Sequence, residues 1–394
     1  MEYRFAKRSS SVEDSFIVEI FKYLQDKEMI SFSGGFPNPE SFPVEQLKQA
    51  SNKVFELDGK SVLQYSQTEG YKPLRQFISN RYKTLYNLDI PYEEILITSG
   101  SQQALDFISK TFIDPNDTVI VEEPSYLGAL QTFGSYEADF LTVELHENGI
   151  DCEDLEQKLI QYNPKLIYVI PNFQNPSGVS YSEANRKLFA DIVKRFNVIV
   201  IEDDPYGEIY FTDDKRTHLK SLIPNQVLLM GSFSKTISPG LRLGWVCAPK
   251  EIHKKLFTCK EASDLHSSYL DQRIIYQYLL DNDYDEHLNR TRSMYHSKQT
   301  QMLGAIDKYF PENVKVYPSN GGMFLWVVLP DDVSSLDLFY EAVIEKVVFV
   351  PGDPFYVNKQ NTNAFRLNFS NASTENIEEG IKRLALVISN KIKK

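Results

Sequence analysis

Short apolar runs, each about as long as a buried strand, alternate with helical stretches through the middle of this chain, and this alternation strongly restricts the fold. The runs, which lie between residues 118 and 249, are TVIVEEP, DFLTVEL, KLIYVIP, VIVIEDDPY, VLLMGSFSK and LGWVCAP. Between them, residues 153–162 and 181–196 show apolar side chains at helical spacing. The pattern predicts an α/β fold with a mostly parallel sheet covered by helices on both faces.

The pattern changes after about residue 250. A long amphipathic helical region covers roughly 250–308, and shorter strands mixed with helices follow, with a last helix from Glu375. A chain of 394 residues is too long for one small core. We therefore predict a large domain over 49–285 and a smaller α+β domain over 286–394. Residues 1–48, a helix within 11–28 followed by a Gly/Pro-rich loop, are expected to pack against the small domain and the site.

Composition disfavours several classes of function. The net charge of −12 argues against nucleic-acid and anionic-membrane partners, because both require a basic surface. The three cysteines cannot form a complete set of disulfides, and their spacing gives no zinc motif, so we expect no metal. The first residues contain no apolar signal core, and no run approaches the ~20 apolar residues of a membrane span. We therefore expect a cytoplasmic protein.

Unusual residues follow several of the predicted strands at the point where each strand ends. They are Ser99, Pro124, Asn175, Asp203 and Lys235. Because ligands of open α/β sheets gather at the carboxyl ends of the strands, one pocket could collect all of these side chains.

Lys235 has the most distinctive surroundings of the five. It directly follows the apolar run VLLMGSF and lies beside Ser232 and Ser234. A lysine kept partly out of water has a lowered pKa and can form a Schiff base with a carbonyl group. Arg242, seven positions later, offers a planar fork that suits a phosphate.

The other strand ends are ambiguous when each is taken alone. Ser99 in TSGSQQALD can help form an anion site at a helix start, but the string is also typical of an ordinary N-cap. Asn175 in NFQNPSG is first of all a turn signal. In IEDDPYGE, alternation along a strand should point Asp203 and Asp204 in opposite directions, and we expect Asp203 to face the ligand. The combination in this order predicts a functional site.

Taken together with the sequence around them, these residues resemble those of a known family. The strings SFSGGFPNPESFP, QYSQTEGYKPLR, TSGSQQALD, NFQNPSG, IEDDPYGE, GSFSKTISPGLRLGW, GGMFLW and FVPGDPF span nearly the whole sequence. They resemble the pyridoxal-phosphate-dependent aminotransferases of fold type I, class I/II, and within them the 2-aminoadipate and kynurenine aminotransferases. The resemblance implies a fold type I transferase with pyridoxal 5′-phosphate as its cofactor, and cis bonds before Pro124 and Pro176.

The resemblance also implies how the cofactor is held. Lys235 would hold it as a Schiff base, Asp203 would pair with the pyridine nitrogen, and Tyr206 and Asn175 would hydrogen-bond the 3′-oxygen. Tyr126 would stack on the ring. The implied phosphate ligands are Ser101, Gln102, Ser232, Ser234 and Arg242.

Two further roles concern the partner subunit and the substrate. Tyr65 would reach the phosphate of a neighbouring subunit, which implies a homodimer with shared sites. Arg366 would bind the substrate α-carboxylate together with Asn175, helped by the backbone at Gly35. Lys235, freed from the cofactor by the substrate, would act as the general base.

The implied reaction is transamination between an L-amino acid and a 2-oxo acid such as 2-oxoglutarate, ping-pong through pyridoxamine phosphate. Some 2-aminoadipate members carry an arginine in the helix before SFSGG that meets the distal carboxylate of the substrate, where this chain has Val18. An apolar residue cannot pair with a buried carboxylate, so this departure favours a neutral or aromatic substrate side chain.

Two alternatives use the same residues. A β-lyase would start from the same carbanion, and no residue separates it from an aminotransferase. A non-catalytic regulator of the same fold would carry an N-terminal winged helix. We do not expect that reading, because the resemblance begins within about the first dozen residues and the acidic charge disfavours DNA.

Overall fold

The computed structural model describes residues 3–6, 8, 16–23, 25–214, 216–358 and 360–392, without the side chains of residues 17, 18 and 21. Of the helix predicted within 11–28, the described part is α1 (Phe16–Tyr23); residues 11–15 and 24 lie outside the described residues, and 25–28 form turns. A last helix predicted from Glu375 is present as α13 (Thr374–Ile392).

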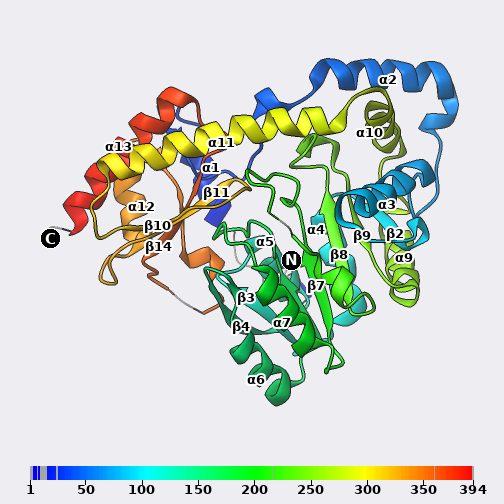
Figure 1. Cartoon of the computed structure of the whole chain (residues 1–394), viewed down its shortest axis with the longest axis horizontal. Helices are drawn as coiled ribbons and strands as arrows, with labels where there is room; N and C mark the ends of the chain where they lie inside the picture. The colour runs from blue at the N-terminus through cyan, green and yellow to red at the C-terminus, as the bar shows by residue number, and fades with distance from the viewer. Residues whose placement is uncertain are drawn as a thin grey trace.

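The central sheet has eight strands in the order β2-β9-β8-β7-β6-β3-β4-β5 (Figure 1). Pairing is parallel from β8 through β7, β6 and β3 to β4, and antiparallel where β9 separates β2 from β8 and where β5 joins β4. The strand bounds are β2 (Ile95–Thr98), β3 (Thr118–Glu123), β4 (Asp139–His146), β5 (Gly149–Ile150), β6 (Leu166–Val169), β7 (Ile199–Asp203), β8 (Val227–Ser232) and β9 (Gly244–Cys247). The predicted, mostly parallel sheet is confirmed.

Helices cover both faces of this sheet because its strands are apolar on both sides. On β3, Val119 and Val121 belong to one core cluster and Ile120 to another, as expected when successive side chains point to opposite faces. The first cluster includes α4 (Ser101–Phe112), α5 (Leu127–Ser135) and α9 (Lys250–Asp264). The second includes α6 (Cys152–Tyr162), α7 (Glu183–Val193) and α8 (Leu219–Leu222).

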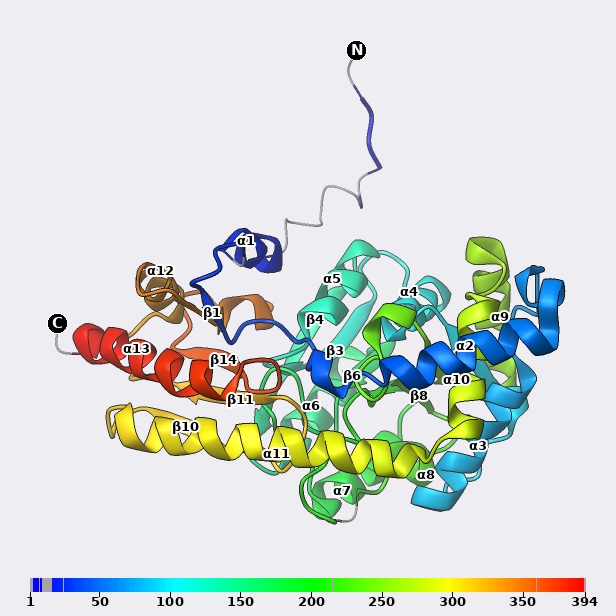
Figure 2. The same cartoon turned by 90° about the horizontal axis from the view of Figure 1, so that it is seen from above.

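A second, antiparallel sheet has the strand order β10-β11-β14-β13. Its strands are β10 (Lys315–Tyr317), β11 (Phe324–Val328), β13 (Val350–Pro351) and β14 (Ala364–Asn368), and β1 (Ile30–Ser31) pairs separately with β12 (Val347–Val348). Helices α12 (Ser335–Ile344) and α13 accompany this part. The 26-residue α11 (Tyr284–Tyr309) packs along α13 and runs from the small sheet toward the large one (Figure 2).

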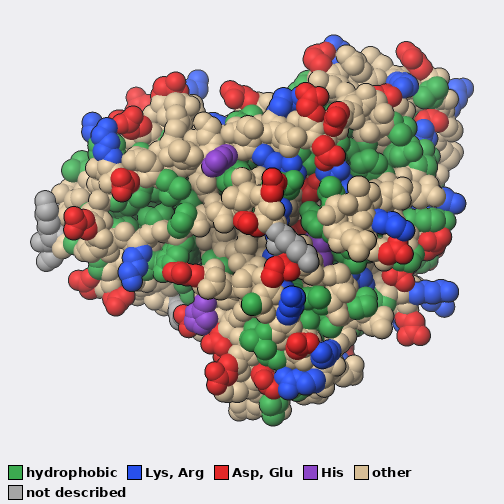
Figure 3. Space-filling model, in the orientation of Figure 1, with side chains coloured by type: hydrophobic (Ala, Val, Ile, Leu, Met, Phe, Trp, Pro, Cys, Tyr) green, Lys and Arg blue, Asp and Glu red, His purple; other side chains and the backbone are tan. Residues whose placement is uncertain are grey.

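The remaining helices lie beside the large sheet: α2 (Val44–Asp58), α3 (Lys72–Tyr86) and α10 (Tyr269–Asp281), where α10 packs against both others. The short 3₁₀ helices are η2 (Pro39–Ser41), η3 (Gly59–Leu63), η4 (Tyr92–Glu94), η5 (Pro239–Leu241) and η6 (Asp353–Phe355). Acidic and basic side chains are interspersed over the face shown in Figure 3. Within the described part of the chain, no helix is both long and apolar enough to cross a membrane.

Candidate active site

One cavity of about 330 Å³ collects nearly all of the residues singled out in the sequence. It opens where the carboxyl ends of the parallel strands meet the N-terminal loop and the small sheet. Of the predicted site residues, the cavity is lined by Gly35, Ser101, Gln102, Tyr126, Asn175, Asp203, Tyr206, Ser232, Ser234, Lys235, Arg242 and Arg366. Among the residues to which the resemblance gives a role, only Tyr65 does not line it.

Lys235 lies in the turn that follows β8, at the wall of the cavity. Its Nζ donates a hydrogen bond to the carbonyl oxygen of Gly35 at 2.7 Å, so the N-terminal loop directly contacts the lysine. Burial, together with the positive charges of Arg366 and Arg242, lowers the pKa of Lys235 from 10.5 to about 8. The amine is therefore available in its neutral, nucleophilic form near neutral pH.

Asp203 ends β7 and is 2% exposed. Its Oδ2 accepts a hydrogen bond from the hydroxyl of Tyr168 at 2.8 Å, whereas its Oδ1 is buried without a hydrogen-bond partner. Burial raises the pKa of Asp203 to about 7. The neighbouring Asp204 points elsewhere, as alternation along the strand predicts: its Oδ1 accepts from the Asn172 side chain. Asp203 thus presents one unsatisfied oxygen at the cavity.

The first turn of α4 and the loop after β8 approach each other on one side of the cavity. Gly100 has φ +80, and a Cβ atom there would lie 2.5 Å from Nη2 of Arg242, so a side chain at this position would displace the arginine. Nη2 of Arg242 donates to the carbonyl oxygen of Ser99 at 3.3 Å. The free N–H groups at the start of α4, the guanidinium and the nearby hydroxyls of Ser232 and Ser234 form a site suited to an anion.

Arg366, on β14, is 5% exposed and also lines the cavity. Its Nη1 donates to Oδ1 of Asn175 at 2.7 Å, and its Nη2 donates to the carbonyl oxygen of Ser33 at 2.6 Å. The guanidinium lies over the rings of Phe324, at 4.3 Å, and Phe355, at 5.2 Å. These contacts fix the plane of a fork that matches a carboxylate.

Two tyrosines and an amide complete the lining. Tyr206 is 4% exposed, and its ring meets the edge of Phe324 with centroids 5.8 Å apart. Tyr126 lies two residues after Pro124, whose bond to Glu123 is cis, and the other cis bond, between Asn175 and Pro176, lies in the loop after β6. Gln102 is exposed and donates to Thr132 at 2.6 Å. Both predicted cis bonds are present.

Tyr65 lies apart from the cavity. Its side chain is 78% exposed, and its ring meets His266 with centroids 5.8 Å apart. It ends an exposed apolar segment that includes Leu57 (66% exposed) and Leu63 (67% exposed).

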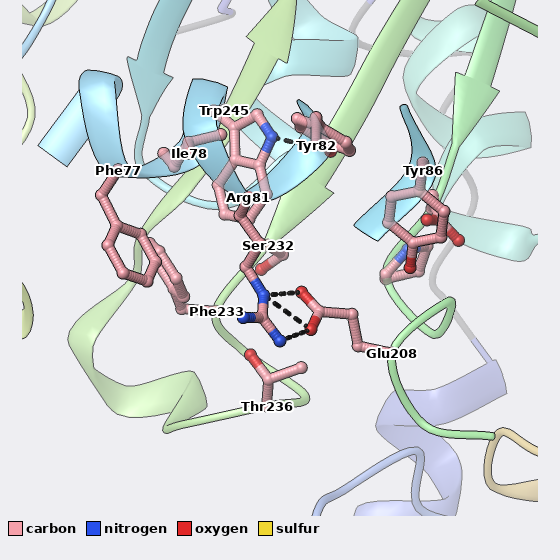
Figure 4. Close-up of a pocket in the computed structure, with 12 residues that line it drawn as sticks. Phe77, Ile78, Arg81, Tyr82, Tyr86, Glu208, Ser232, Phe233, Thr236 and Trp245 are labelled. Carbon is pink, nitrogen blue, oxygen red and sulfur yellow. Dashed lines mark hydrogen bonds and ion pairs between the residues drawn. The ribbon is translucent and has the colours of Figure 1, made fainter. Parts of the chain in front are cut away.

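A smaller cavity of about 30 Å³ lies behind the loop that carries Lys235 and shares Ser232 with the large one. Figure 4 shows the guanidinium of Arg81 among the side chains that line it, where Arg81 pairs with the carboxylate of Glu208 through Nε at 2.8 and 3.0 Å. This ion pair ties α3 to the segment that follows Tyr206. The charged side chains that line this smaller cavity are already paired. They therefore hold the elements behind the site together and are not available to bind a ligand.

Several lining residues were not singled out in the sequence. Ile20, Phe36 and Val350 line the cavity, and Tyr168 contacts Asp203 from β6. A signal for Tyr168 existed: a tyrosine inside the apolar run KLIYVIP needs a buried hydrogen-bond partner. The apolar residues carry no such signal, because their types are those of any core.

The residues fit pyridoxal phosphate, the cofactor implied by the resemblance. The unsatisfied Oδ1 of Asp203 suits a protonated pyridine nitrogen, the site at the start of α4 suits a phosphate, and Lys235 lies in the same cavity with a lowered pKa. Each of the three chemical groups of the cofactor has a complement in this chain.

Comparisons with known proteins agree with this fit. The family model described as "Aminotransferase class I and II" matches residues 27–384. The chain is 36% identical to an aromatic-amino-acid aminotransferase of Thermococcus litoralis, over 100% of this chain and 96% of that protein. It is 39% identical to a 2-aminoadipate transaminase of Thermus thermophilus, over 96% of this chain and 95% of that protein.

A crystal structure of the alpha-aminoadipate aminotransferase from Thermus thermophilus, complexed with N-(5′-phosphopyridoxyl)-L-leucine, has a TM-score of 0.92 to this structure. It is 38% identical, and the match covers 99% of this chain and 98% of that one. The chain therefore belongs to the class I and II aminotransferase family and is a pyridoxal-phosphate-dependent aminotransferase.

Proposed function

We propose that this enzyme transfers the amino group of an L-amino acid with an aromatic, large neutral or 2-aminoadipate-like side chain to a 2-oxo acid such as 2-oxoglutarate. The observation that carries this proposal is that Lys235 and Arg366 line one cavity together with apolar side chains, among them Ile20, Phe36 and Val350. Pyridoxal phosphate supplies the electron sink for this chemistry, and the protein supplies binding, orientation and proton transfer.

Lys235 has two roles in the proposal. Its neutral amine would bind the cofactor through the aldehyde and, once displaced by the amino group of the substrate, would remove the proton from Cα of the substrate as general base. The Gly35 carbonyl, 2.7 Å from Nζ, holds the amine on the substrate side of the cavity. Asp203 pairs with the ring nitrogen, and Tyr206 and Asn175 hydrogen-bond the 3′-oxygen.

The phosphate is held at the start of α4. We assign Ser101, Gln102, Ser232, Ser234 and Arg242 to this role, because hydroxyls, a guanidinium and free helix N–H groups converge there. Tyr126 lines the same cavity, where its ring can stack on the cofactor.

Arg366 binds the substrate α-carboxylate. Its two terminal nitrogens already contact oxygens, Oδ1 of Asn175 and the Ser33 carbonyl, and its plane is fixed by two aromatic rings. A carboxylate can take a bidentate position on such a fork, with Asn175 and the Gly35 backbone beside it.

The lowered pKa of Lys235 predicts how cofactor capture depends on pH. The pKa is lowered, so the neutral amine is the minority form below pH 8 and the majority form above it. Mixing cofactor-free protein with pyridoxal phosphate should give a capture rate that rises with pH, reaches half its plateau near pH 8 and stays flat above. The rate can be followed by stopped-flow absorbance. A rate that keeps rising to pH 10.5, the ordinary value for lysine, would contradict the assigned environment.

The apolar part of the cavity favours neutral substrate side chains. Ile20, Phe36, Pro37 and Val350 line it, and the charged lining residues Asp203, Lys235, Arg242 and Arg366 already have roles. Val18, which bears on the prediction from sequence, has a side chain outside the described residues. Ile20, on α1, is one described residue of this apolar lining at which a cation could be introduced.

We expect kcat/KM for L-phenylalanine and L-leucine to exceed that for L-2-aminoadipate. Ile20→Arg should shift the ratio of kcat/KM toward 2-aminoadipate by roughly tenfold, the size of one hydrogen bond to a charged group. Ile20→Met is the matched control, because it preserves the apolar surface and should leave the ratio unchanged. Activity on 2-aminoadipate alone in the unmodified enzyme would refute the proposed preference.

We also propose a homodimer with shared sites. The support is the set of exposed apolar side chains at the end of α2, in η3 and just after η3: Phe55 is 43%, Leu57 66%, Leu63 67% and Tyr65 78% exposed. An apolar segment of this kind is typical of a surface covered by a partner. Light scattering should give a mass of about twice the 45.4 kDa of one chain. A monomeric mass with full activity would remove the role given to Tyr65.

Two predictions from the sequence stay predictions. The domain bounds 1–48, 49–285 and 286–394 are supported by the two separate sheets and by the start of α11 at Tyr284, and limited proteolysis near residue 285 would test them. A cytoplasmic location also stays a prediction.

A further inference from the structure

Tyr168 is a buried polar side chain in the middle of the large sheet. It lies on β6, is 0% exposed, and its ring meets the edge of Phe133 with centroids 5.7 Å apart. Tyr168 is in register with Ile201 on the neighbouring strand β7, two residues before Asp203. This placement brings its hydroxyl to Oδ2 of Asp203, where it donates a hydrogen bond of 2.8 Å.

Because of this hydrogen bond, the two carboxylate oxygens of Asp203 differ in their surroundings. Oδ2 is satisfied by Tyr168, whereas Oδ1 is buried and has no partner, so the carboxylate cannot rotate without losing its only side-chain donor among the described residues. A carboxylate held in this way presents one oxygen in a fixed direction to whatever binds in the cavity.

The surroundings of Asp203 otherwise oppose its ionised form. The titratable groups that interact with it are Asp204, Glu122, Tyr126, Tyr206 and Tyr168. Burial raises the pKa of Asp203 most, the negative charge of Asp204 raises it further, and the hydrogen bond from Tyr168 lowers it. Within the described protein, Tyr168 is thus the group that stabilises the carboxylate.

We propose that Tyr168 is a positioning residue for the ring nitrogen of the cofactor: it favours the ionised form of Asp203 and directs Oδ1 toward that nitrogen. The inference rests on the proposed pairing of Asp203 with the pyridine nitrogen and adds to it a residue that never touches the cofactor. Without the donor, the carboxylate becomes more basic and retains the proton that it would otherwise leave on the ring nitrogen. The cofactor then binds more weakly and its ring is a poorer electron sink.

The test compares two ligands in each variant. Cofactor-free protein is titrated by equilibrium dialysis with pyridoxal phosphate and with its analogue that carries carbon in place of the ring nitrogen. The analogue has the same phosphate and aldehyde but offers nothing to Asp203. The ratio of the two affinities therefore isolates the contact at the nitrogen, and any general loss of stability cancels because it affects both ligands alike.

Tyr168→Phe removes one oxygen and keeps the ring. We expect the preference for pyridoxal phosphate over the carbon analogue to fall roughly tenfold to a hundredfold, the range for loss of a hydrogen bond to a charged group. In the loaded enzyme, kcat should fall while KM for the amino acid stays nearly constant, because the contacts of Arg366 are unchanged.

Tyr181→Phe is a closely matched control. Tyr181 is also buried, at 3% exposure, and its hydroxyl also donates to a buried carboxylate, Oε1 of Glu122, at 2.7 Å, but neither residue lines the cavity. This variant should leave the preference unchanged. An equal fall in Y168F and Y181F would overturn the inference, because it would show a general effect of removing a buried hydroxyl.

Asp203→Asn separates this inference from the proposed function. If D203N abolishes the preference and Y168F leaves it intact, Tyr168 has no positioning role and the inference is wrong, although the pairing of Asp203 stands. If D203N leaves the preference intact, the pairing itself is wrong and the inference falls with it. A preference that is lost in D203N and reduced in Y168F supports both.

Discussion

Replacing Lys235 with alanine is expected to reduce transamination by roughly 10³-fold or more. In the proposed mechanism the variant loses both the nucleophile for the cofactor and the general base at Cα, and proton transfer alone is typically worth about 10²–10⁴-fold. The structure gives the lysine the properties these roles need: a position on the cavity wall and a pKa lowered to about 8 by burial and two neighbouring arginines. The rate should be measured for both half-reactions under single-turnover conditions.

A small primary amine added to the buffer should restore part of the Cα proton transfer in Lys235→Ala, because it can occupy the vacated space and act as the base. Lys298→Ala is the control: this lysine is also buried, at 9% exposure, but its Nζ donates to the Ala372 carbonyl away from the cavity. It should lower stability and leave the activity per folded molecule unchanged. A Lys235→Ala enzyme that retains a tenth of the normal rate would contradict the role.

Replacing Arg366 with lysine is expected to lower kcat/KM for amino acids by roughly 10²-fold, since truncation of a buried, hydrogen-bonded charge pair costs about 2–5 kcal/mol. Lysine keeps the charge but cannot reproduce the planar fork that contacts Asn175 and Ser33 through two nitrogens. The affinity of the cofactor-free protein for pyridoxal phosphate should change little.

The role of Arg366 can be separated from a general structural role by the choice of substrate. Phenethylamine has the side chain of phenylalanine but no carboxylate, so its slow turnover should be the same in the normal enzyme and in Arg366→Lys. The loss should appear only with phenylalanine. An equal loss with both substrates would mean that the arginine acts by supporting the cavity and not by binding the carboxylate.

Much of the site could be predicted from the sequence because of how parallel sheets are built. The carboxyl ends of their strands share one edge, so Asn175, Asp203 and Lys235 could be placed together without any structure. The antiparallel position of β9 between β2 and β8 was not predicted, because an apolar run such as LGWVCAP looks the same in either direction.

Other features of the site could not be predicted from the sequence, because they depend on backbone atoms or on contacts between residues that are distant in the sequence. The Gly35 carbonyl meets Lys235 across 200 positions, and the Ser33 carbonyl meets Arg366 across 333. Because every residue has a carbonyl oxygen, the residue type at a position gives no indication of such a contact. The ion pair of Arg81 with Glu208 behind the site could not be predicted either, because each of the two residues alone is typical of a solvated surface.

The most direct test of transamination by this enzyme is the stoichiometry of one half-reaction. The enzyme loaded with pyridoxal phosphate is mixed with L-phenylalanine without any 2-oxo acid, and the released phenylpyruvate and free ammonia are both quantified. We expect one phenylpyruvate per bound cofactor, no ammonia, and no further product until 2-oxoglutarate is added. Phenylpyruvate that keeps forming beyond the amount of bound cofactor without any 2-oxo acid, or no phenylpyruvate at all, would contradict transamination.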